Sequence, residues 1–277
     1  MNRTTVLDLR KKKADNNKIV MVTAYDATMA RLVEAAGIDM ILVGDSLGMV
    51  VQGHEDTLPV TLDQIIYHCQ CVARGSSKPH LVADLPFMTY QVSAAQALQS
   101  AGRVVQEGRA QSVKLEGGVA VAESIQRIVE AGIPVLGHVG LTPQSVHAMG
   151  GFRMQGKTQG DAERVLQDAL AVQQAGAYAV VLEGIPSDLA ARITEQLHIP
   201  TIGIGAGVGC DGQVLVCNDL LGMDLSFAPR FVKRFARIEE VAVDALKAYA
   251  EEVRGGTFPA PEHSFATKRE GKVARLY

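Results

Sequence analysis

Four short apolar segments of this chain each end in an acidic residue. They are ILVGD (41–45), LVAD (81–84), VKLE (113–116) and VVLE (180–183). A carboxylate is costly to remove from water, so packing alone does not explain an acidic residue at the end of an apolar strand. In a barrel of parallel strands, catalytic groups converge at the carboxyl ends of the strands. The four segments therefore predict an active site assembled from strand ends.

Three of these carboxylates are expected to lie close together. Asp45, Asp84 and Glu116 end the second, third and fourth predicted strands, and neighbouring strands lie about 4.8 Å apart. Two such charges about 4 Å apart repel by roughly 4 kcal/mol at an effective dielectric of 20, which a bound cation would relieve. Oxygen ligands with one or two direct carboxylates suit Mg²⁺. The alternative for Asp45 and Ser46 is that they cap a helix.

Side-chain parity places Lys114 beside these carboxylates. Residues two apart in a strand share a face, so Lys114 lies with Glu116, while Val113 and Leu115 lie on the other face. The apolar pair is expected to face the surrounding helices, which directs Lys114 into the barrel mouth. A lysine there needs an acidic partner. A purely structural Lys–Glu pair is the alternative to a catalytic role.

Glu183 and His138 lie on the strands that follow. Glu183 ends the sixth strand, which we expect to lie across the barrel from the acidic cluster. Desolvation at an apolar mouth would make a lone carboxylate a stronger base, so Glu183 is the candidate general base. His138, on the fifth strand between them, is expected to face inward. There it either orients a substrate or is a hydrogen-bonded core residue.

The elements that would position these groups follow one repeated module. An amphipathic helix leads to Ala-Gly, then to a β-branched strand, as in EAAGIDMILVG (34–44), EAGIPVLGHVG (130–140) and QAGAYAVVLEG (174–184). Glycine suits the end of a helix, and continuous apolar strands are typical of parallel sheets covered on both faces. Strict alternation of helix and strand predicts right-handed βαβ units.

Eight strands are predicted along the chain. They lie near residues 19–25, 40–44, 81–85, 112–116, 134–139, 179–183, 201–204 and 213–217. This number favours an α/β fold of the closed (β/α)8 TIM-barrel type, which typically needs about 250 residues, over an open sheet. A helix at 238–254 is expected to close the ring from outside. The prediction is one domain over residues 1–277, with an extended tail from about 255 to 277.

Composition narrows the class of protein. The chain has 277 residues, of which 47% are hydrophobic and 21% charged, and a net charge of −3. These values fit a globular protein and give no reason to expect nucleic acid or an anionic membrane as a partner. Four cysteines in a chain of this size are typical of reduced thiols, and the amino-terminal segment lacks the apolar core of a signal peptide. We therefore expect a cytoplasmic protein.

Long motifs also point to a family. They are MVTAYD (21–26), VGDSLGMVVQGH (43–54), TLPVTLD (57–63), VADLPF (82–87), VKLEG (113–117), GHVGLTP (137–143), IGIGAG (202–207) and FPAPEHSF (258–265). Through these motifs, from about residue 5 to 265, the sequence closely resembles the ketopantoate hydroxymethyltransferases. The resemblance implies a (β/α)8 barrel of the phosphoenolpyruvate/pyruvate-superfamily type, a cytoplasmic enzyme of pantothenate biosynthesis, and a homodecamer.

The resemblance also implies a reaction and residue roles. A hydroxymethyl group would pass from 5,10-methylenetetrahydrofolate to 3-methyl-2-oxobutanoate through an enolate stabilised by Mg²⁺. Asp45, Asp84 and Glu116 would be the metal ligands, and Glu183 the proton acceptor. The 2-oxo acid would contact four residues, Asp45, Ser46, Asp84 and Lys114. His138 is added to the predicted substrate contacts because of its place on the fifth strand.

Two other functions stay open. A Mg²⁺-dependent carbon–carbon lyase of the isocitrate lyase and phosphoenolpyruvate mutase type would share the bound 2-oxo acid and the enolate but would need no folate. A barrel that has lost its chemistry would bind the oxo acid without exchanging its C3 proton. The presence of all the acidic groups together with Lys114 argues against such a binding protein.

Overall fold

Eight parallel strands close into a barrel. The structure is a computed structural model that describes residues 3–225 and 229–265. The strands are Ile19–Thr23 (β1), Met40–Val43 (β2), His80–Asp84 (β3), Ser112–Glu116 (β4), Val135–Gly140 (β5), Ala179–Glu183 (β6), Thr201–Ile204 (β7) and Gly212–Leu215 (β8). Each strand pairs in parallel with its neighbours in the sequence, and β1 pairs with β8. The predicted barrel is confirmed, with strand ends within two residues of those expected.

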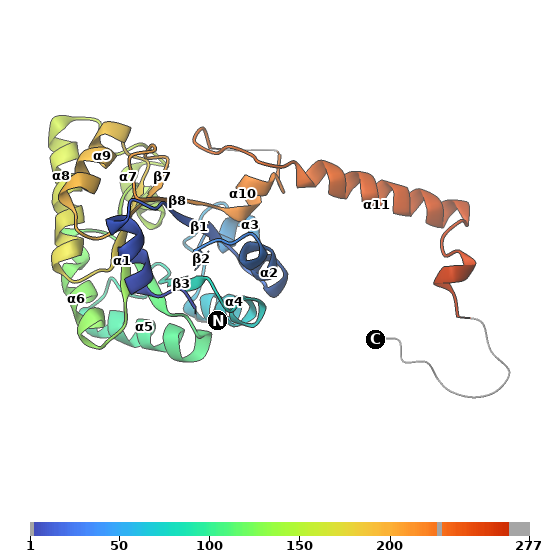
Figure 1. The fold of residues 1–277 in the computed structure, drawn as a ribbon, viewed down its shortest axis with the longest axis horizontal. Coiled ribbons are helices and arrows are strands. Elements are labelled where there is room, and N and C mark those ends of the chain that lie inside the picture. The colour runs from blue at the N-terminus through green and yellow to red at the C-terminus, as the bar shows by residue number, and fades with distance from the viewer. Residues whose placement is uncertain (1–2, 226–228, 266–277) are drawn as a thin grey trace.

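Helices alternate with the strands and surround the ring (Figure 1). The larger ones are α2 (Ala27–Ala35), α4 (Leu62–Gly75), α5 (Ala94–Gly108), α6 (Ala122–Glu130), α8 (Gln159–Gln174), α9 (Ser187–Gln196) and α11 (Ile238–Gly255). The remaining ones are α1 (Val6–Ala14), which is as long as α2 and α6, the short helices α3 (Leu47–Val50), α7 (Val146–Met149) and α10 (Cys217–Leu221), and the 3-10 turns η1 (Val119–Val121), η2 (Pro143–Ser145) and η3 (Pro261–His263).

The Ala-Gly pairs end helices as predicted. Gly37, Gly132 and Gly176 follow α2, α6 and α8, and their φ angles are 72°, 85° and 96°. A residue with a Cβ atom would pay about 1–2 kcal/mol for this left-handed conformation, so glycine lets the chain turn directly from helix to strand.

The strands carry one apolar layer on the inside of the barrel and another on the outside. Met21, Val82 and Leu136 belong to a cluster inside the ring. Val113 and Leu115 belong to the larger cluster that packs against the helices. The predicted parity of β4 is therefore confirmed: its apolar residues face the helices, and its charged residues face the barrel interior.

The amino ends of the strands are closed by α1 and a buried histidine. Leu9 of α1 is fully buried with the cluster inside the ring. Nδ1 of His80, at the start of β3, donates to the Thr4 carbonyl at 3.0 Å. Its Nε2 lies 2.9 Å from Ser112 Oγ, which donates to it. Burial, together with the nearby Arg3 charge, lowers the pKa of His80 to about 4 against the opposing effect of the Thr4 hydrogen bond.

We expect this histidine to make the protein sensitive to acid. The unfolded chain, with a histidine pKa of 6.5, binds more protons than the folded chain between pH 4 and 6.5. The free energy of unfolding should therefore fall as pH drops through this window, by at most about 3 kcal/mol from His80. Urea unfolding of wild type and His80→Gln at pH 7 and pH 4.5 measures the effect. A wild type that loses no more stability than the variant would contradict it.

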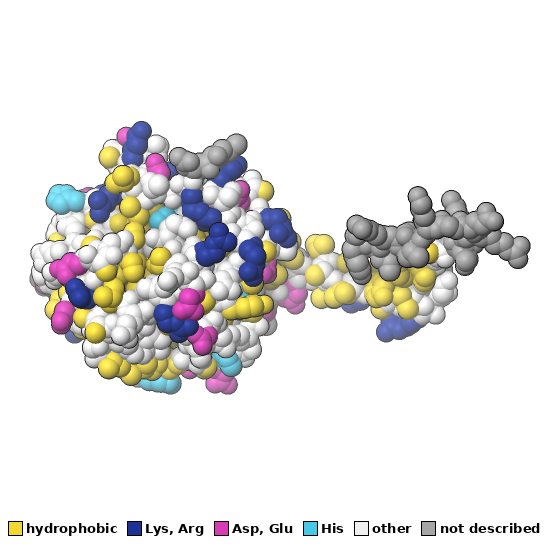
Figure 2. Space-filling model, turned by 90° about the horizontal axis from the view of Figure 1, so that it is seen from below, with side chains coloured by type: hydrophobic (Ala, Val, Ile, Leu, Met, Phe, Trp, Pro, Cys, Tyr) yellow, Lys and Arg dark blue, Asp and Glu magenta, His cyan; other side chains and the backbone are white. Residues whose placement is uncertain are grey.

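Helix α11 forms where predicted, but the expectation that it closes the ring is wrong. Figure 1 shows it projecting away from the barrel, and none of its residues is buried. Hydrophobic side chains gather on this projecting part of the molecule (Figure 2). The apolar spacing in α11 shows that one face can be buried, but it does not say which surface covers that face.

The predicted tail lies only partly within the described residues. Residues 266–277 are outside them, and η3 occupies part of the segment that follows α11. In the part of the chain that the structure describes, no helix is both long enough and apolar enough to cross a membrane.

Candidate active site

The ends of β2, β3 and β4 bring three carboxylates to one end of the barrel. Asp45, Asp84 and Glu116 are 5%, 1% and 5% exposed. The backbone N–H of Asp45 donates to Asp84 Oδ2 at 3.3 Å, which ties the end of β2 to the end of β3. The predicted convergence of the three acidic residues is thus present in the structure.

Lys114 lies among these carboxylates. Its Nζ is 2.8 Å from Asp84 Oδ1 and 3.9 Å from Glu116 Oε1, and the side chain is buried. The contact with Asp84 is a close, buried ion pair. Burial acts to lower the pKa of Lys114, but Asp84, Glu116 and Asp45 outweigh it and raise that pKa. Lys114 is therefore protonated.

One ammonium does not balance three buried carboxylates. Burial raises the pKa of Asp84 to about 7 even though Lys114 opposes the rise, and the Asp45 charge adds to it. Burial likewise raises the pKa of Glu116 well above its usual range, again opposed by Lys114 and reinforced by Asp45 and Asp84. A further positive charge in this site would favour the ionised form of both groups.

Glu183 is linked to this cluster through His138. His138 Nε2 lies 3.2 Å from Glu183 Oε2, and His138 Nδ1 lies 3.3 Å from Lys114 Nζ and 3.6 Å from Glu116 Oε1. His138 thus lies between Glu183 and the cluster, as predicted, and Glu183 is not a lone carboxylate because this ring lies beside it. The fifth strand places a single imidazole ring between the proposed base and the cluster.

His138 has a defined protonation state in this arrangement. Burial and the Lys114 charge lower its pKa against the opposing effect of Glu183, so the ring is neutral at pH 7. A protonated Lys114 can only donate, so Nδ1 accepts from it and the ring proton is on Nε2, facing Glu183. His138 is buried, with Lys114 beside Nδ1 and Glu183 3.2 Å from Nε2, and both neighbours are predicted catalytic groups.

Ser46 lies at the rim of the site. Its Oγ is 2.9 Å from the Tyr25 hydroxyl. Ser46 occupies the N-cap position of α3, but its side chain makes no capping hydrogen bond. The alternative that this segment serves as a helix cap is therefore not supported.

Two buried residues of the site were not predicted from the sequence. Gln144, in η2 after β5, contacts both Asp45 and Glu116. Tyr90, in the loop after β3, contacts Gln144 and the backbone of Glu116. Gln144 does follow a strand end, directly after the GHVGLTP motif (137–143), and this position is the one signal that points to it.

Comparison with known proteins identifies the family of this chain. The family described as ketopantoate hydroxymethyltransferase matches residues 3–261. The chain belongs to the ketopantoate hydroxymethyltransferase family. It is therefore an enzyme of the transferase class, and the predicted resemblance is confirmed.

Curated relatives of the same family cover nearly the whole chain. The 3-methyl-2-oxobutanoate hydroxymethyltransferase of Syntrophotalea carbinolica is 58% identical over 264 residues, which are 95% of this chain and 99% of the relative. The protein of that name from Syntrophomonas wolfei is 52% identical over the full length of both chains. The transferase is thus favoured over the lyase alternative.

Solved structures at low identity share the fold. A phosphonopyruvate hydrolase in complex with oxalate and Mg²⁺ has a TM-score of 0.61 and 14% identity, covering 95% of this chain and 93% of its own. A 2,3-dimethylmalate lyase of the phosphoenolpyruvate mutase/isocitrate lyase superfamily has a TM-score of 0.60 and 16% identity, covering 95% and 89%. These likenesses show a shared fold, in agreement with the (β/α)8 barrel predicted for this member of the hydroxymethyltransferase family.

The donor set of this family member fits Mg²⁺. Within residues 3–225 and 229–265, no three His, Cys, Asp or Glu side chains form a ready-made cage for a metal ion. Mg²⁺ does not require one, because it binds through one or two carboxylates and completes its shell with water and substrate. The acidic cluster offers oxygen ligands only, from three buried carboxylates.

Proposed function

We propose that this chain transfers a hydroxymethyl group from 5,10-methylenetetrahydrofolate to 3-methyl-2-oxobutanoate, giving ketopantoate for pantothenate biosynthesis, with Mg²⁺ as cofactor. The observation that carries the proposal is the placement of Glu183 one imidazole ring away from the cluster around Lys114. A base beside a site that stabilises negative charge is what proton removal next to a carbonyl requires. The names of the relatives at 52–59% identity support the same reaction.

The proposed roles follow from the contacts. Asp45, Asp84 and Glu116 would hold Mg²⁺, which when bound supplies Lewis acidity at the 2-oxo group and a template for the oxo acid. Lys114 would hold the negative charge that develops on the 2-oxo oxygen. Ser46 and His138 would complete the substrate contacts, His138 next to the base.

Glu183 would take the proton from C3 of 3-methyl-2-oxobutanoate. The enolate carbon would then form a bond to the methylene carbon carried by the folate. That carbon leaves its nitrogen atoms, water supplies the hydroxyl oxygen, and tetrahydrofolate is released. The neutral His138 presents its Nε2 proton to Glu183 Oε2 and would hold that carboxylate toward the substrate.

A product assay tests this proposal against the lyase. Purified protein is incubated with 3-methyl-2-oxobutanoate, with or without 5,10-methylenetetrahydrofolate, and ketopantoate is measured by mass spectrometry. We expect product only with the folate present and only after Mg²⁺ is added to protein treated with a chelator. Cleavage of 2,3-dimethylmalate without folate, in place of ketopantoate formation, would instead support the lyase.

We further propose that the protein forms a homo-oligomer, of which the decamer is the form implied by resemblance, in the cytoplasm. On the outside of the barrel, Val20 of β1 and Gln213 of β8 are paired neighbours and are both exposed. The other six strands have no exposed residue. Helix α10, after β8, has only five residues. Among the described residues, this outer face therefore lacks the helix that covers each other part of the ring.

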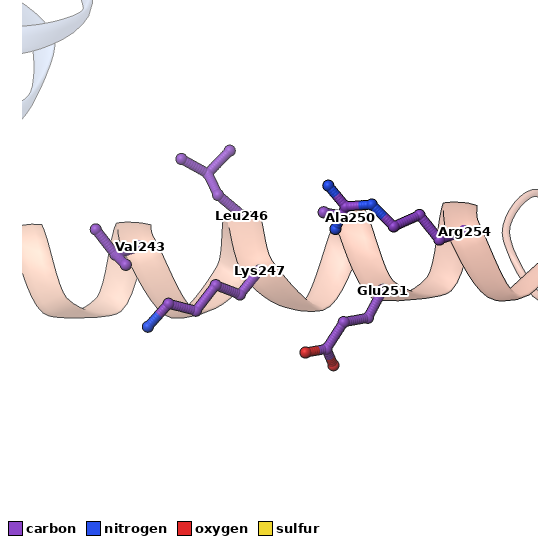
Figure 3. Close-up of a pocket in the computed structure, with 6 residues that line it drawn as sticks. All are labelled: Val243, Leu246, Lys247, Ala250, Glu251 and Arg254. Atoms are coloured by element: carbon purple, nitrogen blue, oxygen red, sulfur yellow. The ribbon is translucent and has the colours of Figure 1, made fainter.

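Helix α11 offers the matching surface. Its stripe of apolar residues at helical spacing is exposed: Ile238, Val241, Leu246, Tyr249 and Val253. Figure 3 shows the side chains of Leu246 and Val243 on this helix, and both are exposed. Since α11 projects away from its own barrel (Figure 1), a second copy of the chain could receive it on the uncovered face of β1 and β8.

Changing this stripe should break the assembly. Leu246 is 66% exposed, so Leu246→Asp adds a charge to the apolar face without removing a contact within one chain. We expect sedimentation velocity to show an oligomer for wild type and a smaller species for Leu246→Asp. Lys247→Asp, one residue further and off the stripe, is the control and should keep the oligomer. A monomeric wild type, or dissociation by both variants alike, would contradict the proposal.

A further inference from the structure

Gln144 makes five hydrogen bonds at the bottom of the acidic cluster. Its Nε2 donates to Asp45 Oδ2 and to the Leu85 carbonyl, each at 2.9 Å. Its Oε1 accepts from the Tyr90 hydroxyl at 2.7 Å and from Gln91 Nε2 at 3.1 Å. Its backbone N–H donates to Glu116 Oε2 at 3.0 Å. This one buried residue therefore joins the ends of β2, β3, β4 and β5.

The orientation of the amide follows from its neighbours. The Leu85 carbonyl and the Asp45 carboxylate can only accept, so the amide nitrogen must face them. Both amide hydrogens and both lone pairs of the amide oxygen are then in use. A side chain with every donor and acceptor satisfied in a buried site has little freedom to rotate, because each alternative leaves a polar atom unpaired.

In each of the three carboxylates, one oxygen accepts a hydrogen bond from a backbone N–H or from the Gln144 amide. Asp45 is held through Oδ2 and Glu116 through Oε2, both by Gln144, while Asp84 Oδ2 accepts from the Asp45 backbone. Each carboxylate thus keeps a second oxygen. For Asp84 and Glu116, that second oxygen is the one that faces Lys114.

Tyr90 holds Gln144 from the other side. Its hydroxyl donates to Gln144 Oε1 and accepts from the Glu116 backbone N–H at 3.2 Å. The ring is 2% exposed, so this hydroxyl is fixed by packing. Tyr90 therefore holds Gln144 in place, and Gln144 in turn holds Asp45 and Glu116.

We propose that Gln144 is a positioning residue that presents the second carboxylate oxygen of Asp45 and of Glu116 to a divalent cation, with Tyr90 holding Gln144 in place. This inference rests on the proposed function, since it takes the acidic cluster as the cation site. Gln144 itself is not a ligand, because both amide hydrogens face acceptors and its oxygen faces donors.

Cation affinity, measured without substrate, tests the role directly. Mn²⁺ is titrated into the metal-free full-length protein and followed by electron paramagnetic resonance, with Mg²⁺ titration calorimetry in parallel. Groups that orient metal ligands typically change metal affinity by about 10–100-fold when replaced, so Gln144→Met should raise Kd by that factor. Tyr90→Phe removes both hydrogen bonds of that hydroxyl. Loss of the one to Gln144, worth about 1 kcal/mol, should raise Kd about 5-fold.

The control is a glutamine at the other end of the barrel. Gln173 Oε1 accepts from the backbone N–H groups of His198 and Ile199, just before β7. Gln173→Met should lower the unfolding temperature without changing Kd, which separates positioning from general stability.

Two results would overturn the inference alone: an unchanged Kd in folded Gln144→Met, or an unchanged Kd in Tyr90→Phe if Gln144→Met does not fold. A wild type that binds neither cation would contradict both this inference and the Mg²⁺ site of the proposed function.

Discussion

Replacing Glu183 by Gln is expected to lower kcat for ketopantoate formation by about 10²–10⁴-fold, the usual contribution of a general base. Gln has the same shape but cannot accept the C3 proton. Glu183 Oε2 lies 3.2 Å from His138 Nε2, and the amide oxygen of Gln can still accept from that nitrogen. The variant should therefore fold and bind the oxo acid normally. Initial rates at saturating substrate and Mg²⁺ measure the effect.

A matched change on the surface separates charge loss from loss of the base. Glu195 is exposed on α9, away from the carboxyl ends of the strands. Glu195→Gln should leave kcat unchanged. If Glu183→Gln turned over as fast as wild type, the assignment of Glu183 as the base would be wrong, and another group would have to take the proton.

Replacing Lys114 by Met is expected to damage both activity and stability. It removes the ammonium that lies 2.8 Å from Asp84. Removing one partner of a buried ion pair costs about 3–5 kcal/mol, because the remaining charge stays buried. Loss of a group that stabilises developing negative charge lowers kcat by about 10²–10³-fold. Thermal unfolding of the metal-free protein and steady-state kinetics with Mg²⁺ measure the two effects.

The lysine control lies at the amino ends of the strands. Lys13 Nζ is 2.7 Å from Asp211 Oδ2, and both side chains are partly exposed. Lys13→Met should lose some stability and keep kcat. Added Mg²⁺ should raise the unfolding temperature of Lys114→Met more than that of Lys13→Met, since only the former removes the ammonium from the acidic cluster proposed to bind the cation. Equal shifts in the two variants would show that Lys114 and the proposed cation do not share a charge cluster.

The positions of the charged groups could be predicted from the sequence because strands follow a strict rule. Alternation along VKLE (113–116) fixes which side chains face inward, and the order of strands fixes which carboxylates are neighbours. Lys114 and Glu116 therefore lie where parity places them. The glycines after α2, α6 and α8 were also predictable, because the end of a helix depends only on the local backbone conformation.

The contacts that depend on loops could not be predicted in this way. Gln144 and Tyr90 reach the site from segments whose conformation no periodic pattern fixes, and a polar residue in a loop has no parity to show that it is buried. The distance between Glu183 and the cluster depends on how the His138 ring fills the space between the strands. Helix α11 could be predicted as a helix. Where it packs depends on the surface that covers its apolar face, and the sequence alone does not identify that surface.

The proposed reaction begins when this barrel removes the C3 proton of 3-methyl-2-oxobutanoate with help from a divalent cation. The most direct measurement is NMR of proton–deuterium exchange at C3 in D₂O, with and without Mg²⁺, and with no folate present. We expect C3 exchange by wild type that requires Mg²⁺ and is lost in Glu183→Gln. No exchange with Mg²⁺, despite confirmed binding of the oxo acid and even after methylenetetrahydrofolate is added, would contradict it.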